Sequence, residues 1–134
     1  MLSLKGVYVE GCVKGLEESW VRQLRTCGVV LAAVTETGSE EVQLLIAPQE
    51  RVNELLPQYP NLIWIQLVDK GADSVDLAQI RARGILLTDG TMLYHPGYIH
   101  DPFKARDMIE RNFRRYFAGE PLEGIVYQPE RSLL

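Results

Sequence analysis

Short apolar runs alternate with helical segments between residues 7 and 88. Each run ends at a glycine, a proline or a polar turn, which is typical of a buried strand that leads into a helix. Strands joined by crossover helices form a parallel sheet that is covered on both faces. The sequence therefore predicts a flavodoxin-like three-layer α/β fold, with five parallel strands in the order 2-1-3-4-5. The predicted strands are 7–9, 29–34, 42–47, 62–68 and 85–88, and the predicted helices between them are 16–27, 50–56 and 74–83.

Length and composition limit the chain to a single domain, residues 1–134. With 134 residues, 46% of them hydrophobic, it can bury one core but not two full α/β domains. The net charge of −4 is spread along the sequence, so we expect no nucleic-acid surface. No apolar segment approaches bilayer length and the N-terminus does not resemble a leader, so we expect no membrane partner and a cytoplasmic location.

Cysteine and histidine offer little chemistry. The two cysteines, Cys12 and Cys27, form no C-x-x-C pair, and no histidine cluster has metal-ligand spacing, so we expect neither a disulfide scaffold nor a metal site. The two histidines, His95 and His100, lie late in the chain, far from Cys12 in sequence. A nucleophilic cysteine needs a nearby base, so we interpret Cys12 as a packing residue.

A longer amphipathic helix is predicted near the end of the chain. Asp101 is a suitable N-cap, Pro102 fits the first helical position, and Gly119 fits the position after the last turn. Phe113 and Phe117 belong to an apolar stripe, and we expect both in the core that the helix shares with the sheet. The basic side chains on the remaining face are interpreted as solvated.

Two segments resemble the substrate-binding domain of the D-2-hydroxyacid dehydrogenases. The first reads PNLIWIQ at 60–66, DKGAD at 69–73, RGI at 83–85 and TDG at 88–90. Its one mild departure is Ala72, because that family usually has Gly-Val-Asp in this loop. The second segment reads IERNFRRYFAGEPL at 109–122 and is similar to the closing helix of the family.

The resemblance implies a substrate-binding domain in two parts, 1–90 and 102–134, joined by a linker at 91–101 where the family has its nucleotide-binding domain. The catalytic arginine and glutamate of the family then have no positions here. The catalytic histidine has one candidate counterpart, His95, in the sequence YHPGY at 94–98. Its spacing is one residue short, so we prefer to interpret His95 as a linker residue.

No dinucleotide fingerprint is present in the sequence. The glycines of GCVKG at 11–15 have the wrong spacing for G-x-G-x-x-G, for a P-loop and for a flavodoxin phosphate loop, and are interpreted as turn residues. We therefore expect no cofactor and no NAD binding by the chain alone. NAD is expected as a cofactor only if a partner chain supplies the nucleotide-binding domain. A phosphoacceptor receiver domain is also disfavoured, because Glu10-Gly11 and Ala47-Pro48 stand where its acidic residues would be.

The resemblance places substrate binding at Lys70, Gly71 and Ala72, where main-chain N–H groups would hold a carboxylate. Glycine lets two N–H groups turn toward one point, and the start of the following helix favours an anion. Lys70 could add a positive charge. In the alternative interpretation, residues 73–76 simply cap a helix and Gly71 is the bend that reaches it. The two interpretations are compatible.

These observations predict a truncated D-2-hydroxyacid dehydrogenase-like protein, which binds a small carboxylate or a protein partner without catalysis. The competing hypothesis is an NAD-dependent 2-hydroxyacid oxidoreductase whose nucleotide-binding domain comes from another chain. Loss of a domain would expose the surface that it once covered. We therefore also expect self-association, most simply as a homodimer, with the 91–101 linker involved.

Overall fold

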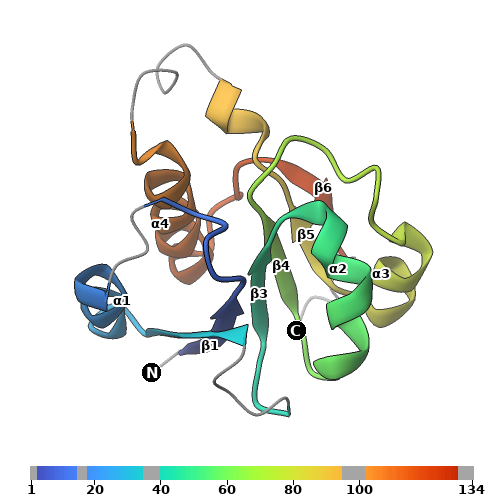
Figure 1. Cartoon of the computed structure of the whole chain (residues 1–134), viewed down its shortest axis with the longest axis horizontal. Helices are drawn as coiled ribbons and strands as arrows, with labels where there is room; N and C mark the ends of the chain where they lie inside the picture. The colour runs from blue at the N-terminus through green and yellow to red at the C-terminus, as the bar shows by residue number, and fades with distance from the viewer. Residues whose placement is uncertain (1–2, 15–17, 35–39, 95–101, 130–134) are drawn as a thin grey trace.

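The computed structural model describes residues 3–14, 18–34, 40–94 and 102–129 (Figure 1). These residues form one sheet, four α-helices and two short 3-10 helices. The strands are β1 (Leu4–Tyr8), β2 (Val29–Ala33), β3 (Leu44–Ala47), β4 (Trp64–Leu67), β5 (Leu86–Thr88) and β6 (Ile125–Tyr127). The helices are α1 (Glu18–Arg25), α2 (Gln49–Leu55), η2 (Leu56–Gln58), α3 (Leu77–Arg83), η3 (Thr91–Tyr94) and α4 (Lys104–Ala118).

The sheet has six strands in the order β2-β1-β3-β4-β5-β6. The first five are parallel and follow the predicted order 2-1-3-4-5. The prediction of a purely parallel five-stranded sheet was wrong, because β6 adds a sixth strand antiparallel to β5. The sequence did not indicate β6, since a three-residue strand is too short to show an alternating pattern.

A glycine fixes where β6 joins the sheet. Gly124 has φ of +75°, and a Cβ at this position would lie 2.5 Å from the main-chain oxygen of Asp89. The Asp89 N–H donates to the Gly124 carbonyl at 2.8 Å. Only glycine combines this backbone conformation with so close an approach. The pairing of β5 with β6 is irregular between Leu87 and Thr88, next to this contact.

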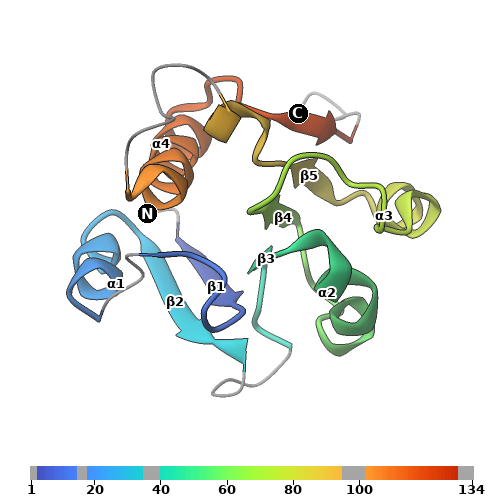
Figure 2. The ribbon, with the colours of Figure 1, turned by 45° about the horizontal axis from the view of Figure 1, so that its top comes forward.

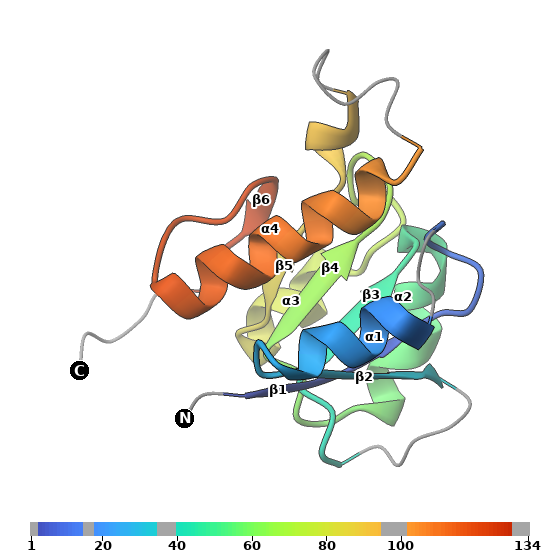
Figure 3. The same ribbon diagram turned by 90° about the vertical axis from the view of Figure 1, so that its left-hand side faces the viewer.

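The helices form two layers on opposite faces of the sheet. Figure 2 shows α1 and α4 on one face and α2 and α3 on the other. Viewed from the side of the first pair, α1 and α4 both cross the sheet (Figure 3). The Trp20 Nε1–H donates to Glu110 Oε1 at 2.8 Å and links these two helices. Among the described residues, none of the helices combines the length and the apolar character needed to cross a bilayer.

Two apolar clusters, one on each face, make up the core. Leu45 of β3 and Ile65 of β4 point to the side of α2 and α3, whereas Leu44 and Trp64 point to the side of α1 and α4. All four residues of β3 and of β4 are buried. Strands buried on both faces read as continuous apolar runs, which is why the sequence predicted them well.

Helix α4 packs on the sheet through Phe113. Phe113 is 1% exposed and contacts Trp64 edge to face, with 5.7 Å between ring centroids. Tyr116 stacks on Trp64 at 5.1 Å. Phe117 is only partly buried at the margin of the same cluster, so the expectation that both phenylalanines lie inside the core was correct for Phe113 alone.

The predicted boundaries of two helices were wrong. Helix α4 begins at Lys104 with Phe103 at the N-cap and no side-chain cap, so Pro102 precedes the helix and Asp101 lies outside the described residues. It ends at Gly119 as predicted, with φ of +74°. Helix α3 begins at Leu77 in place of residue 74, because the Asp76 side chain accepts from the Gln79 N–H and caps it there.

A buried polar network ties α4 to β4, β5 and the segment before β6. Gln66, Thr88 and Asn112 are all 0% exposed. Gln66 Oε1 accepts from Thr88 Oγ1–H at 2.7 Å and from Asn112 Nδ2–H at 2.8 Å, and Thr88 Oγ1 accepts from Trp64 Nε1–H at 2.9 Å. Asn112 Oδ1 accepts from the Glu123 N–H at 2.9 Å. Buried polar groups favour one arrangement of the chain when all of them are satisfied.

Candidate functional site

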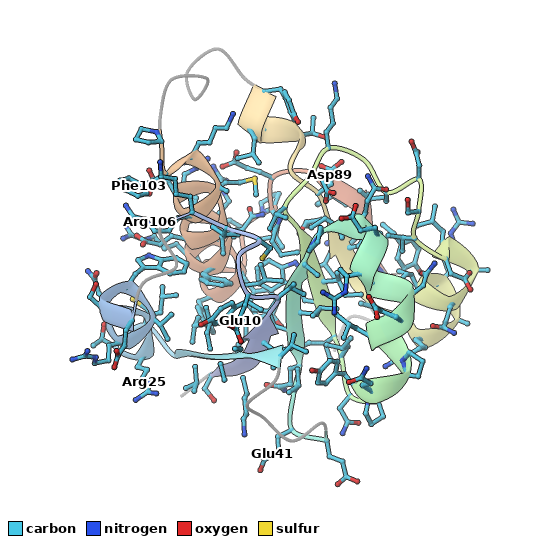
Figure 4. All side chains as sticks on the ribbon, in the orientation of Figure 1. Glu10, Arg25, Glu41, Asp89, Phe103 and Arg106 are labelled. Carbon is cyan, nitrogen blue, oxygen red and sulfur yellow. The ribbon has the colours of Figure 1, made fainter. Side chains whose placement is uncertain are left out.

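The turns that follow β4 and β5 meet at the carboxyl edge of the sheet. The Gly71 N–H, in the turn after β4, donates to Asp89 Oδ2 at 2.9 Å. Asp89 directly follows β5 and is 6% exposed (Figure 4). Gly71 has φ of +84°, the left-handed conformation that turns its N–H toward this carboxylate. The N–H that the resemblance assigns to a substrate is therefore bonded to a carboxylate of the chain itself.

Asp89 organises the whole edge. Its Oδ1 accepts from the Thr91 N–H at 3.0 Å, and its Oδ2 accepts from Thr91 Oγ1–H at 2.8 Å. Its main chain bonds to Gly124 at the start of β6. The Asp89 carboxylate thus joins the turn after β4 to the start of η3, and the Asp89 main chain joins both to the approach to β6.

Asp69 holds the start of α2 in a similar way. Both of its carboxylate oxygens lie within hydrogen-bonding distance of the Gln49 N–H, at 3.0 and 3.3 Å. Gln49 is the first residue of α2, where an unpaired N–H and the helix dipole both favour a negative charge. The Asp69 carbonyl also accepts from the Gly90 N–H at 2.6 Å. Both acidic residues of this edge are therefore bonded to main-chain N–H groups.

Side chains from α2 fix the rest of the turn between β4 and α3. The Ser74 N–H donates to Gln49 Oε1 at 2.9 Å, and the Asp76 N–H donates to Asn53 Oδ1 at 2.8 Å. Asn53 Nδ2–H donates back to the Ser74 carbonyl at 2.8 Å. The side chains of Gln49 and Asn53 therefore fix the backbone conformation of this turn.

Two lysines and one tyrosine project near this turn and form what we term the lysine–tyrosine cluster: Lys70, Tyr94 and Lys104. The Lys70 and Lys104 ammonium groups lie 5.5 and 5.7 Å from the centroid of the Tyr94 ring, which is within cation–π distance. Tyr94 is 59% exposed. Neither ammonium pairs with a carboxylate of the described residues, so this cluster concentrates positive charge beside the turn.

The predicted site residues fall in different environments. Lys70 is exposed and belongs to the lysine–tyrosine cluster, Gly71 forms the bend, and Ala72 is 8% exposed and packs into the core. The sequence identified this turn but not Asp89 or Lys104 as its neighbours. A signal for Asp89 was present, because Asp-Gly after a strand lies at the same sheet edge as Gly after the neighbouring parallel strand. His95 and His100 lie outside the described residues.

Cys12 follows β1 and lies partly buried. Burial raises the pKa of its thiol from 9.0 to about 11, and the negative charge of Asp69 adds to the shift. A thiol with such a pKa is protonated at neutral pH and is a poor nucleophile. Within the described residues, no group of three or more His, Cys, Asp and Glu side chains could hold a metal ion.

The larger of two notable cavities, of about 310 Å³, lies away from this edge. Leu86 at the start of β5 and Tyr116 near the end of α4 line it, together with Gly119, Glu120, Pro121 and Leu122 after the helix and Gln128 after β6. It therefore lies toward the amino edge of the sheet, opposite the turns just described.

No protein-family model and no curated protein matches the chain. One solved structure, a 2-hydroxyacid dehydrogenase from Ketogulonicigenium vulgare Y25, superposes with a TM-score of 0.49 at 17% sequence identity. The match covers 98% of this chain and 45% of that chain, so this chain spans less than half of that dehydrogenase.

Proposed function

We propose that this chain binds a small carboxylate at the turn between β4 and α3, and that the lysine–tyrosine cluster supplies most of the attraction. The supporting observation is the convergence of Lys70 and Lys104 on Tyr94, with no carboxylate of the described residues paired to either lysine. Two ammonium groups that both lie near one ring attract an anion more strongly than either does alone.

The two acidic residues of the neighbouring turn are already bonded to main-chain N–H groups. Asp69 and Asp89 would repel a carboxylate, but their hydrogen bonds to the Gln49, Gly71 and Thr91 N–H groups offset part of their charge. The sequence resemblance to the D-2-hydroxyacid dehydrogenases assigns a substrate carboxylate to this same turn. Because the Gly71 N–H is engaged with Asp89, the ligand in our proposal is held by the lysines and not by that N–H.

Hydride transfer is not part of the proposed function of this chain by itself. A nicotinamide must be held against the substrate carbon, which requires a pyrophosphate site that the sequence does not contain. Oxidoreductase activity would require a nucleotide-binding domain from another chain. The competing hypothesis predicts no NADH binding by the chain alone but saturable NADH binding by a native complex that contains it, so NADH titrations of the chain and of such a complex separate the two.

The binding proposal is tested by ¹H–¹⁵N correlation spectra during titration with pyruvate and D-lactate, with lactamide as an uncharged control. The main-chain signals of the turn report on the site directly. Tryptophan fluorescence is less suitable as a readout, because Trp64 is fully buried in the core. We expect saturable shifts at Lys70 to Ala72 and at Tyr94, with carboxylates only. Added salt should weaken the binding, because both lysines are accessible to solvent.

Charge-removing variants complete this test. Lys70→Gln and Lys104→Gln should each weaken binding by about threefold, the usual contribution of an exposed ion pair. Lys5→Gln is the matched control, because Lys5 lies at the amino end of β1 and pairs with Glu41. Equal shifts with lactamide, or unchanged affinity in both cluster variants, would contradict the proposal.

A further inference from the structure

The cavity of about 310 Å³ lies at the amino edge of the sheet and shares no lining residue with the lysine–tyrosine cluster. Strand β6 runs antiparallel to β5, so Gln128 after β6 comes beside Leu86 at the start of β5. The segment 119–122, which follows α4, lines the cavity from the side of the helix. Its volume lies at the lower end of the roughly 300 to 1,000 Å³ typical of small-molecule sites.

Tyr116 gives this cavity an aromatic wall that is fixed in place. Its ring stacks on Trp64 with 5.1 Å between the ring centroids and 13° between the ring planes. Trp64 is fully buried, and its Nε1–H donates to Thr88 Oγ1 at 2.9 Å. Leu86 and Leu122 add aliphatic side chains to the lining. A ligand with an apolar body, and an aromatic ring above all, therefore complements these walls.

Glu120 is the one charged residue among the described residues that line the cavity. Arg111 and Arg115 of α4 pair with Glu123, at N–O distances of 2.9 and 3.7 Å, and not with Glu120. Within the part of the chain that the structure describes, the exposed Glu120 carboxylate forms no hydrogen bond and no ion pair. Its negative charge is therefore available to a ligand.

The end of α4 adds to the negative potential of this cavity. The Glu120 N–H bonds back to the Arg115 carbonyl at 2.9 Å. Pro121 has no N–H, so the Phe117 carbonyl lacks the donor that a helix would supply four residues further on. Carbonyl groups at the end of a helix carry the negative end of the helix dipole and favour a cation.

We propose that this cavity binds a small organic ammonium with an aromatic body, of the arylalkylamine class. The ammonium lies against Glu120 and the end of α4, and the ring packs against Tyr116, Leu86 and Leu122. An anion would be repelled by the same groups. The site thus selects the charge opposite to that of the carboxylate proposed for the other edge of the sheet, and it does not depend on that proposal.

The experiment titrates phenethylammonium into ¹⁵N-labelled protein. The matched ligands are 2-phenylethanol without the charge, 3-phenylpropanoate with the opposite charge, and butylammonium without the ring. We expect saturable shifts with phenethylammonium at five main-chain N–H groups that surround the cavity: Leu86, Gly119, Glu120, Leu122 and Gln128.

The matched ligands separate the contributions of charge and ring. We expect 2-phenylethanol to bind at least about fivefold more weakly, because it loses the attraction of both Glu120 and the helix end. Butylammonium, which resembles a lysine side chain, should bind at least about threefold more weakly, the usual contribution of an aromatic pair. We expect no saturable shifts at these positions with 3-phenylpropanoate. Equal affinity for phenethylammonium and any one of the three would overturn the proposal.

Variants locate the charge. Glu120→Gln should weaken phenethylammonium binding by about threefold, and Glu120→Lys by more, because it reverses the charge. Glu120 is exposed and unpaired within the described residues, so neither variant threatens folding. Glu50→Gln, at an exposed position of α2 on the opposite face of the sheet, is the matched control and should leave binding unchanged. Unchanged affinity in Glu120→Gln, shifts confined to residues 70–72, or no saturable shifts at all would each overturn the assignment.

Discussion

Asp89 is the residue on which the carboxyl edge most depends. Its buried carboxylate accepts hydrogen bonds from the Gly71 N–H, the Thr91 N–H and the Thr91 hydroxyl. Asp89→Ala would leave these donors without their partner, and we expect it to lower the free energy of unfolding by about 2–4 kcal/mol. Asp73→Ala, at an exposed position of the nearby turn, should cost less than about 0.5 kcal/mol. Urea unfolding followed by circular dichroism measures both losses. Equal losses of unfolding free energy in the two variants would contradict the prediction that the Asp89 hydrogen bonds stabilise this edge.

The two cysteines should differ sharply in reactivity. Cys27 is exposed, whereas burial raises the pKa of the Cys12 thiol to about 11. At pH 8 only about one thousandth of Cys12 is then thiolate, so iodoacetamide should modify Cys27 first, and Cys12 labelling should accelerate as the pH rises toward 11. Mass spectrometry of labelled Cys12→Ser and Cys27→Ser variants separates the two rates. Rapid labelling of Cys12 at pH 7 would contradict its burial.

The same pKa links Cys12 to stability. The folded state keeps the thiol protonated up to a higher pH than the unfolded state does. The stability that this contributes is therefore present in full below pH 9, the ordinary thiol pKa, and is lost as the pH rises toward about 11. Cys12→Ser, which does not titrate in this range, should lose less stability between pH 9 and 11 than the parent chain.

At the scale of elements, α4 packs on the sheet through one face, and Phe113 contributes most to the stability of that contact. Phe113 is 1% exposed against Trp64, so Phe113→Ala should cost about 3–5 kcal/mol through the cavity that it leaves. Phe117 is only partly buried, so Phe117→Ala should cost clearly less, about 1–2 kcal/mol. Thermal and urea melts of the two variants test this ranking. Equal costs would mean that α4 packs with a different face toward the sheet.

The sequence predicted elements whose signal is local and missed those whose position depends on distant partners. Strands β3 and β4 were recognised because burial on both faces makes them continuous apolar runs. Strand β6 was missed because it has three residues and is positioned by the bond from Asp89 to Gly124. The turn at Lys70 to Ala72 was recognised from its sequence. The pairing of Gly71 with Asp89 was not, because it follows from the register that sets Gln66 beside Thr88.

At the scale of the whole molecule, β6 ends the sheet at one edge. No strand among the described residues pairs with its outer side, and Ile125 and Val126 are 40% and 38% exposed. Exposed apolar edge strands tend to pair with another chain. We therefore expect concentration-dependent self-association in sedimentation velocity experiments, which Val126→Lys should reduce. A monomer at every concentration would contradict this expectation.

The two parts of the chain, residues 1–90 and 102–134, share one core and should fold as one unit. Strands β1 to β5 lie within residues 1–90, but their cover on one face comes partly from α4 through Met108, Ile109 and Phe113. The Gln66 and Thr88 side chains also depend on Asn112 for a satisfied network. Without α4, the face around Trp64 would be exposed to water and the Gln66 side chain would lose the hydrogen bond from Asn112. The combined loss should exceed the free energy of unfolding of a domain of this size.

A chain ending at Gly90 should therefore be insoluble, or should keep far-ultraviolet circular dichroism while losing its near-ultraviolet signal and its cooperative melt. A chain ending at Pro129, which retains every described element, is the matched control and should melt like the parent. A cooperative transition in the 1–90 fragment would mean that α4 is an appended helix, free to serve a partner. Its absence, together with a normal melt of the 1–129 chain, would mean that α4 is integral: the helix from residues 104–118 then completes the core that residues 4–88 begin.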